Sequence, residues 1–77
     1  MNIKKRITID PKIMVGKPVI TGTRIPVEII LKKLAQDMSV SAILKDYPRL
    51  EKEDVKAAIL YAREAVEGEE VYTFKTS

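Results

Sequence analysis

The sequence contains no cysteine and no histidine among its 77 residues. Without cysteine no disulfide can form, and without both residue types zinc and copper lose their usual protein ligands. A chain of this length buries only a modest fraction of its surface, and small domains usually gain stability from disulfides, metals or a partner subunit. By elimination, the sequence predicts a partner, either a second copy of the chain or another protein.

The same absences argue against catalysis. Histidine and cysteine supply the usual general base and the thiol nucleophile of enzymes. Ser39 and Ser41 have no base nearby in the sequence and are better explained as helix-capping residues. The stretch GKPVITGT does not have the spacing of a phosphate-binding P-loop. We therefore expect no enzymatic activity, no catalytic residue, no cofactor and no metal.

Long apolar runs are also missing. No segment approaches the roughly 20 apolar residues that span a bilayer, and the basic KKR near the start is not followed by the apolar run of a secretory signal. We expect a soluble, cytoplasmic protein.

Positive charge is concentrated in the first part of the chain. Residues 1–49 hold ten Lys/Arg and four Asp/Glu, a net charge of +6, whereas residues 50–77 hold four and seven, a net charge of −3. The charge of the first part favours binding to a polyanion. The charge of the second part favours binding to a basic surface or exposure to solvent. A mixed, solvated surface explains the same charges without any ligand.

Two short β-strands are expected before the helices. In NIKKRITI the isoleucines stand at odd positions between polar residues, which predicts a strand over Ile3–Ile9. A second strand is expected over Pro18–Thr21. Gly16 and Gly22 permit backbone angles that other residues resist. Two such strands cannot form a stable sheet alone, so they need a helix beneath them or strands from a second copy.

Apolar residues at helical spacing predict three helices, over residues 26–36, 40–46 and 51–67. Pro26 suits a first helical turn, with Thr23 as its cap or Ile25 leading in. Ser39 suits the start of the second helix, and Gly68 the end of the third. The residues expected on the buried helix faces are Val27, Ile30, Leu31, Leu34, Val40, Ile43, Leu44, Val55, Ala58, Ile59, Ala62, Ala65 and Val66. Residues 1–67 then form one domain, and residues 68–77 form a tail.

Several blocks stand at fixed spacing through the chain: Asp10-Pro11, Gly16, Pro18, ITGTRIPV at 20–27, SV at 39–40, IL at 43–44, DYP at 46–48, Leu50 and EDV at 53–55. This pattern, which runs from about residue 7 to 63, resembles the small prokaryotic family called domain of unknown function four-three-three. Many of its members look like VapB-type antitoxins, which inhibit a PIN-like ribonuclease toxin encoded beside them. The resemblance implies a mainly α, usually dimeric fold: a three-helix helix-turn-helix domain, homeodomain-like or winged, with one or two short strands before it and an extended C-terminal tail.

The short helix, tight turn and longer helix suit a helix-turn-helix, although an ordinary three-helix bundle has the same periodicity. The candidate DNA-binding residues are Arg24, Lys32, Lys33, Arg49, Lys52 and Lys56. Lys4, Lys5, Arg6 and Lys17 add to the basic supply of the N-terminal half. The acids at positions 51, 53 and 54 would repel phosphates and are better explained as helix-starting residues.

The tail carries large apolar side chains, in contrast to most disordered tails. The candidate toxin-binding residues are Arg63, Val71, Tyr72, Phe74 and Lys75. A basic residue delivered to an acidic, metal-binding nuclease site could compete with the metal. The tail could instead pack back as a strand beside Ile3–Ile9, or fray at the terminus.

Arg24 has two interpretations. Its guanidinium suits an internal ion pair with Asp10 or Asp46, and it equally suits DNA or the toxin. For the whole protein we carry three hypotheses: an antitoxin that binds a PIN-like toxin and its own promoter, a stand-alone dimeric DNA-binding regulator, and an adaptor that binds no nucleic acid. A homodimer is expected in which the N-terminal strands of two copies form a four-strand layer.

Overall fold

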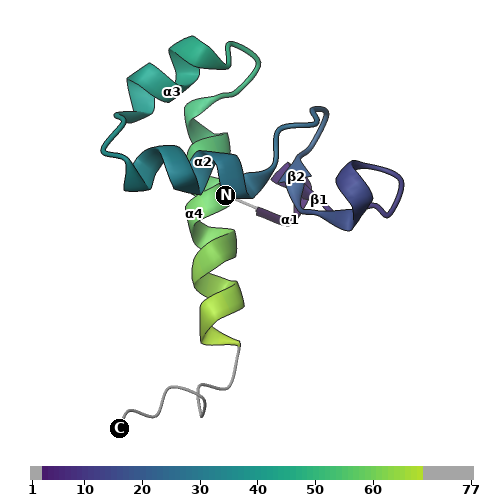
Figure 1. Cartoon of the computed structure of the whole chain (residues 1–77). Helices are drawn as coiled ribbons and strands as arrows, with labels where there is room; N and C mark the ends of the chain where they lie inside the picture. Colours follow the sequence, from purple (N-terminus) through teal and green to yellow (C-terminus); the bar gives the residue numbers. More distant parts are fainter. Residues whose placement is uncertain (1–2, 69–77) are drawn as a thin grey trace, which may run out of the picture.

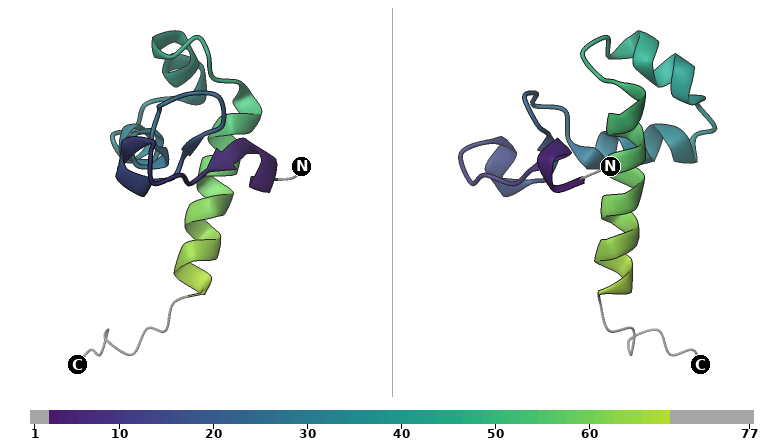
Figure 2. Two further views of the ribbon diagram at one scale, coloured as in Figure 1. Left: turned by 90° about the vertical axis from the view of Figure 1, so that its right-hand side faces the viewer. Right: turned by 180° about the vertical axis from the view of Figure 1, so that it is seen from behind.

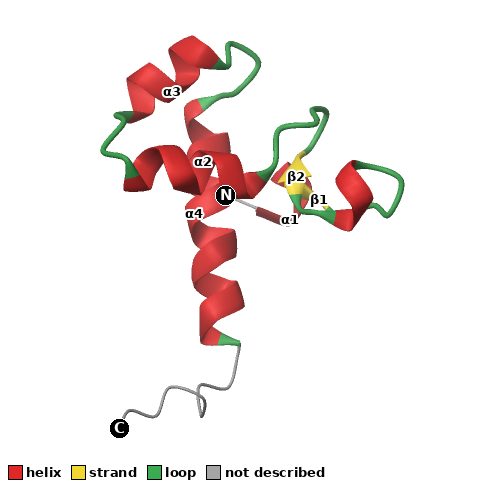
Figure 3. Cartoon of the chain, viewed as in Figure 1, coloured by secondary structure: helices red, strands yellow, loops and turns green. Residues whose placement is uncertain are grey.

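The computed structural model describes residues 3–68. The elements in chain order are α1 (Ile3–Arg6), β1 (Ile7–Thr8), the 3-10 turn η1 (Met14–Gly16), β2 (Val19–Ile20), α2 (Val27–Ala35), α3 (Val40–Asp46) and α4 (Lys52–Glu67) (Figure 3). The protein is mainly α, with three main helices after a short antiparallel strand pair, which confirms the fold class predicted from the sequence.

The core lies where α2 and α3 pack on the first half of α4 (Figure 1). Its buried apolar residues are Val19, Ile20, Val27, Ile30, Ile43, Leu50, Val55, Ala57 and Ala58. Leu31, Leu34 and Leu44 pack against this cluster and are partly buried. The 3.6-residue periodicity of the sequence therefore located most of the core contributed by the helices.

The first expected strand is wrong over half its length. Only Ile7 and Thr8 are extended, and Ile3–Arg6 forms one helical turn, α1. The partner strand β2 is just two residues long and pairs Ile7 with Ile20 and Thr8 with Val19. One further bond, from the Thr21 N–H to the Arg6 carbonyl at 2.9 Å, ends the ladder. Without more partner strand, the preceding residues satisfy their backbone groups locally in a turn.

The strand pair is completed within this chain. On the side of β2 away from β1, the Ile20 N–H donates to the Ile25 carbonyl at 3.0 Å and the Val27 N–H donates to the Pro18 carbonyl at 2.9 Å. Ile20 itself is buried against the helices. Both edges of β2 are thus occupied by the chain, so a four-strand layer with a second copy would have to form along β1.

The start of α2 differs from the sequence prediction. Pro26 is the N-cap, with extended backbone angles, and the first helical residue is Val27. Thr23 does not cap the helix. Its hydroxyl donates to the Ile20 carbonyl at 2.7 Å and accepts from the Ile25 N–H at 3.0 Å. Thr23 therefore closes the turn that follows β2. The N–H and C=O groups within reach of the Thr23 side chain belong to that turn and not to α2.

The other helix boundaries follow the sequence closely. The bounds of α3 are those predicted, and the Ser39 hydroxyl accepts from the Ala42 N–H at 3.1 Å as its cap. Helix α4 begins one residue later than predicted, and Gly68 caps its end. Gly16 and Gly22 have φ angles of +83° and +81°, as expected of glycine at these turns.

The second half of α4 extends beyond the other elements in all three views (Figures 1 and 2). Ile59 is 46 % exposed and Val66 66 % exposed, and Ala65 is exposed as well. The prediction that the apolar face of this helix is buried along its whole length is therefore wrong for Ile59, Ala65 and Val66, whereas Ala62 is half-buried. No other element of residues 3–68 is long enough to follow α4 to its end. We call residues 59–68 the projecting arm.

Asp54 is a buried charged residue at the start of α4, only 6 % exposed. Its Oδ2 accepts from the Glu51 N–H at 2.8 Å, and its Oδ1 accepts from Arg6 Nη1 at 2.9 Å. Arg6 Nη1 also lies 3.1 Å from Glu51 Oε1. The hydrogen bond to Asp54, followed by that to Glu51, raises the pKa of the Arg6 guanidinium above its ordinary value. One carboxylate thus caps α4 and ties the segment before β1 to it.

Replacing Asp54 by alanine is expected to lower the free energy of unfolding by about 2 kcal/mol, because the helix loses its cap and Arg6 loses its main partner. Urea unfolding followed by circular dichroism measures this loss. Glu53→Ala is the matched control, since Glu53 is an exposed acid in the same helical turn. Equal unfolding midpoints for the two variants would contradict a structural role for Asp54.

Candidate functional site

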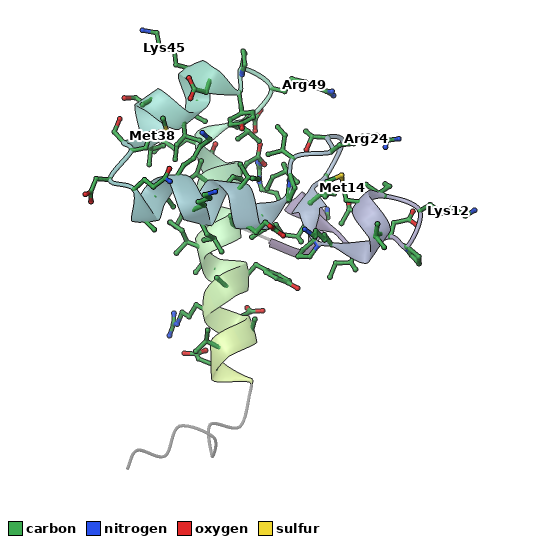
Figure 4. All side chains as sticks on the ribbon, viewed as in Figure 1. Lys12, Met14, Arg24, Met38, Lys45 and Arg49 are labelled. Atoms are coloured by element: carbon green, nitrogen blue, oxygen red, sulfur yellow. The ribbon has the colours of Figure 1, made fainter. Side chains whose placement is uncertain are left out.

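Two of the predicted DNA-binding residues, Arg24 and Arg49, come together although they are far apart in the sequence. They line one surface depression with Ile13, Gly22 and Thr23. Figure 4 shows both guanidinium groups extending outward on the same side of the molecule, with Lys12 on that side as well. Both arginines are exposed. We call this depression the arginine pocket.

The backbone of the β2–α2 loop shapes the arginine pocket. Gly22 takes a φ of +81°, a conformation that side chains rarely adopt, and this turns its carbonyl toward the α3–α4 connection. Arg49 Nη2 donates to that carbonyl at 2.8 Å. Because the loop is also closed by the Thr23 side chain, Arg24 leaves it from a fixed position.

No acidic residue of positions 3–68 lines the arginine pocket. A neighbouring depression shares Arg49, but there Lys5 and Arg6 face three acids, namely Glu51, Glu53 and Asp54. Positive charge is therefore balanced on one side of Arg49 and uncompensated on the other.

The internal ion pair considered for Arg24 does not form. Within residues 3–68, Arg24 makes no ion pair with Asp10, Asp46 or another acid. Asp10 instead accepts from the Lys12 N–H at 2.9 Å in a local turn. The arginine that binds a buried acid is Arg6. From the sequence, Arg6 was expected to be one of the basic residues that could bind a polyanion. Neither the spacing nor the composition signalled the contact between Arg6 and Asp54, because 48 residues separate them.

The remaining predicted DNA-binding residues lie elsewhere. Lys52 and Lys56 line a mainly apolar depression with Val40, Val55 and Ile59 on the α3–α4 side. Lys32 is exposed on α2, and Lys33 Nζ lies 5.6 Å from the centre of the Tyr47 ring, a cation–π contact. The six candidates thus lie in at least three places: the arginine pocket, the α3–α4 side and α2.

Of the predicted toxin-binding residues, the structure places Arg63. It is exposed on the projecting arm, and its Nε donates to Glu67 Oε2 at 3.0 Å. Val71, Tyr72, Phe74 and Lys75 lie outside the described residues.

Residues 3–68 contain neither a cluster of metal ligands nor a membrane-spanning helix. No three Asp, Glu, His or Cys side chains gather there as metal ligands. None of the helices in the same range combines the length and the apolar content of a membrane span.

The family model described as "Protein of unknown function (DUF433)" matches residues 7–62. A relative from Sinorhizobium fredii, the uncharacterized protein y4eO, is 38 % identical over 56 residues; the match covers 73 % of this chain and 25 % of the relative, so this chain spans about a quarter of its length. An uncharacterized protein from Archaeoglobus fulgidus is 67 % identical over 24 residues, which cover 31 % of this chain and 67 % of that protein.

A solved structure is similar over most of the fold. It is the 2.00 Å crystal structure of a DUF433 member protein from Anabaena variabilis, with a TM-score of 0.77 and 32 % sequence identity. The match covers 84 % of this chain and 64 % of that chain. Sequence and structure agree that this chain belongs to the DUF433 family of proteins of unknown function.

Proposed function

We propose that this protein is the antitoxin of a type II toxin–antitoxin pair, which inhibits a PIN-like ribonuclease and represses its own promoter. The observation that carries the proposal is the division of the chain into a packed body and a projecting arm. An inhibitor that also binds DNA needs two surfaces that can be occupied together. Here the arginine pocket lies on the body, and α4 carries the chain away from it to Gly68.

The arm supplies the toxin-binding part of the proposal. Arg63 is exposed on it, and residues 69–77, with Val71, Tyr72, Phe74 and Lys75, follow directly after its end. Apolar anchors beside a basic side chain suit an acidic nuclease cleft, because the anchors bury area and the cation faces the metal-binding carboxylates.

The body supplies the DNA-binding part. Helix α3, a five-residue connection and α4 follow one another as in a helix-turn-helix, and Arg49 lies in that connection. The net charge of +6 over residues 1–49 favours a polyanion. The same surface would serve a stand-alone DNA-binding regulator, which differs from an antitoxin in lacking a toxin partner.

A homodimer belongs to the same proposal, with its contact placed on α4. Ile59, Ala62 and Val66 follow one another at spacings of three and four residues, the spacing of a helix-pairing seam. Ile59 and Val66 are exposed in the single chain. Because β1 is only two residues long, we propose this exposed seam as the contact in place of the strand layer.

Deleting residues 69–77 is expected to abolish neutralisation of the PIN-like toxin encoded beside this chain, while the helical content and promoter binding stay unchanged. A growth-rescue assay and circular dichroism measure the two effects. A matched pair refines the test: full-length chains with Val71, Tyr72 and Phe74 changed to serine, or with Thr73 and Thr76 changed to serine. Full rescue by the truncated chain would refute this role for the tail.

Promoter binding is expected to weaken steeply with salt, because phosphate contacts release counterions. For about three contacts the affinity falls roughly 40-fold between about 50 and 200 mM salt. A gel-shift titration of the promoter fragment at several salt concentrations measures the slope. An affinity independent of salt would exclude the basic surface as the site of binding.

Light scattering at micromolar concentration is expected to give the mass of two copies, and Val66→Glu is expected to give one, since a carboxylate would be buried in the seam. Glu64→Ala, a change on another face of the arm, is the control and should remain dimeric. A wild-type chain that is monomeric at this concentration would rule out the dimer.

A further inference from the structure

We propose that Arg24 and Arg49 form a clamp for one phosphodiester group of nucleic acid in the arginine pocket. This inference rests on the promoter binding proposed above and adds to it the residues that hold the backbone. It requires that two arginines line one depression, that one guanidinium is already positioned, and that no acid among residues 3–68 neutralises them.

The lining satisfies the first requirement. Among residues 3–68, the arginine pocket is lined by two arginines, two loop residues and one apolar side chain, Ile13, and by no acid. Uncompensated charge in a depression attracts an anion more strongly than the same charge on a convex surface, because the low-dielectric walls focus the field. The neighbouring depression has Arg6 bound to Asp54 and Glu51 and therefore offers no comparable attraction.

The second requirement is satisfied by the bond between Arg49 and the Gly22 carbonyl. That bond, at 2.8 Å, uses one N–H of a group that has five. The guanidinium is held in place while its other donors stay free. Arg24 emerges two residues after Gly22, so the same loop sets the position of both arginines. A planar guanidinium can bind two phosphate oxygens at once.

A nucleic acid backbone suits this site better than an acidic protein surface. The arginine pocket has little apolar area to hold a peptide, since Ile13 is its one large apolar residue. Lys12 extends on the same side, where a polyanion with regularly spaced charges would meet a further cation (Figure 4). Arg49 lies two residues before Glu51, the N-cap of α4. A phosphate held there would fix the register of α4 on the duplex without reading bases.

The test measures fluorescence anisotropy of a labelled promoter duplex against salt concentration. Arg24→Ala is expected to weaken binding about tenfold and to reduce the salt slope by about one, the loss of one phosphate contact. Lys45→Ala is the matched control, because it removes one positive charge from an exposed site on α3 that points away from the arginine pocket (Figure 4). It should change both quantities much less.

The variant Arg49→Lys distinguishes binding of two phosphate oxygens by the guanidinium from attraction by its positive charge alone. Lysine keeps the charge and cannot bind two oxygens in a fork, so this variant is expected to weaken binding nearly as much as Arg24→Ala. Urea unfolding checks that the folds are intact. Arg24→Ala should unfold at the wild-type midpoint, because Arg24 has no ion pair in the described part of the chain.

Three outcomes would overturn the clamp. The first is equal loss of binding in Arg24→Ala and Lys45→Ala, which indicates general charge attraction. The second is toxin neutralisation lost in Arg24→Ala while DNA binding is unchanged, which makes the arginine pocket a protein contact. The third is inorganic phosphate that binds the wild-type chain and not Arg24→Ala while duplex binding stays unchanged, which makes the arginine pocket a site for free phosphate. A wild-type chain that binds no duplex refutes promoter binding itself, so failure of the proposed function is distinguishable from failure of the clamp.

Discussion

The bond between the Asp54 carboxylate and the Arg6 guanidinium holds together two segments that lie 48 positions apart. Asp54 also accepts from the Glu51 N–H, so the first turn of α4 and the N-terminal segment are fixed by one buried side chain. From Arg6 the chain continues directly into β1, which pairs with β2, and β2 leads into the loop that carries Arg24. The position of the arginine pocket therefore depends on an ion pair at its neighbouring surface.

Helix α4 belongs to two parts of the molecule. Its first half completes the core through Val55, Ala57 and Ala58, whereas its second half extends past the elements that cover the first. Because the packed end fixes the direction of the helix, the exposed end has a defined position relative to the core although it is not buried. In the proposed antitoxin this lets the body bind DNA and the arm bind the toxin at the same time, and it separates the two surfaces in space.

The arrangement of charge is more informative than its sum. The basic residues of positions 1–49 were expected to act together, yet they differ in kind: Arg6 stabilises the fold, Lys17 pairs with Glu28, Lys33 lies over an aromatic ring, and Arg24 and Arg49 share a depression that no acid of residues 3–68 lines. Only the last kind has the geometry of an anion site. A charge becomes a candidate for function when the fold brings it to a second one and leaves both uncompensated.

The sequence by itself determined the mainly α fold, the bounds of α3, the Ser39 cap, the turns at Gly16 and Gly22, and the buried residues of α2 and α3. These features depend on neighbours within four residues, and periodicity and turn chemistry report such neighbours directly. Only the tertiary structure decided that Ile3–Arg6 is helical, that Thr23 closes a turn, that Ile59 and Val66 are exposed, and that Arg6, not Arg24, binds the buried acid. Each of these depends on which distant segment lies opposite, and on how far it extends, which no local pattern encodes.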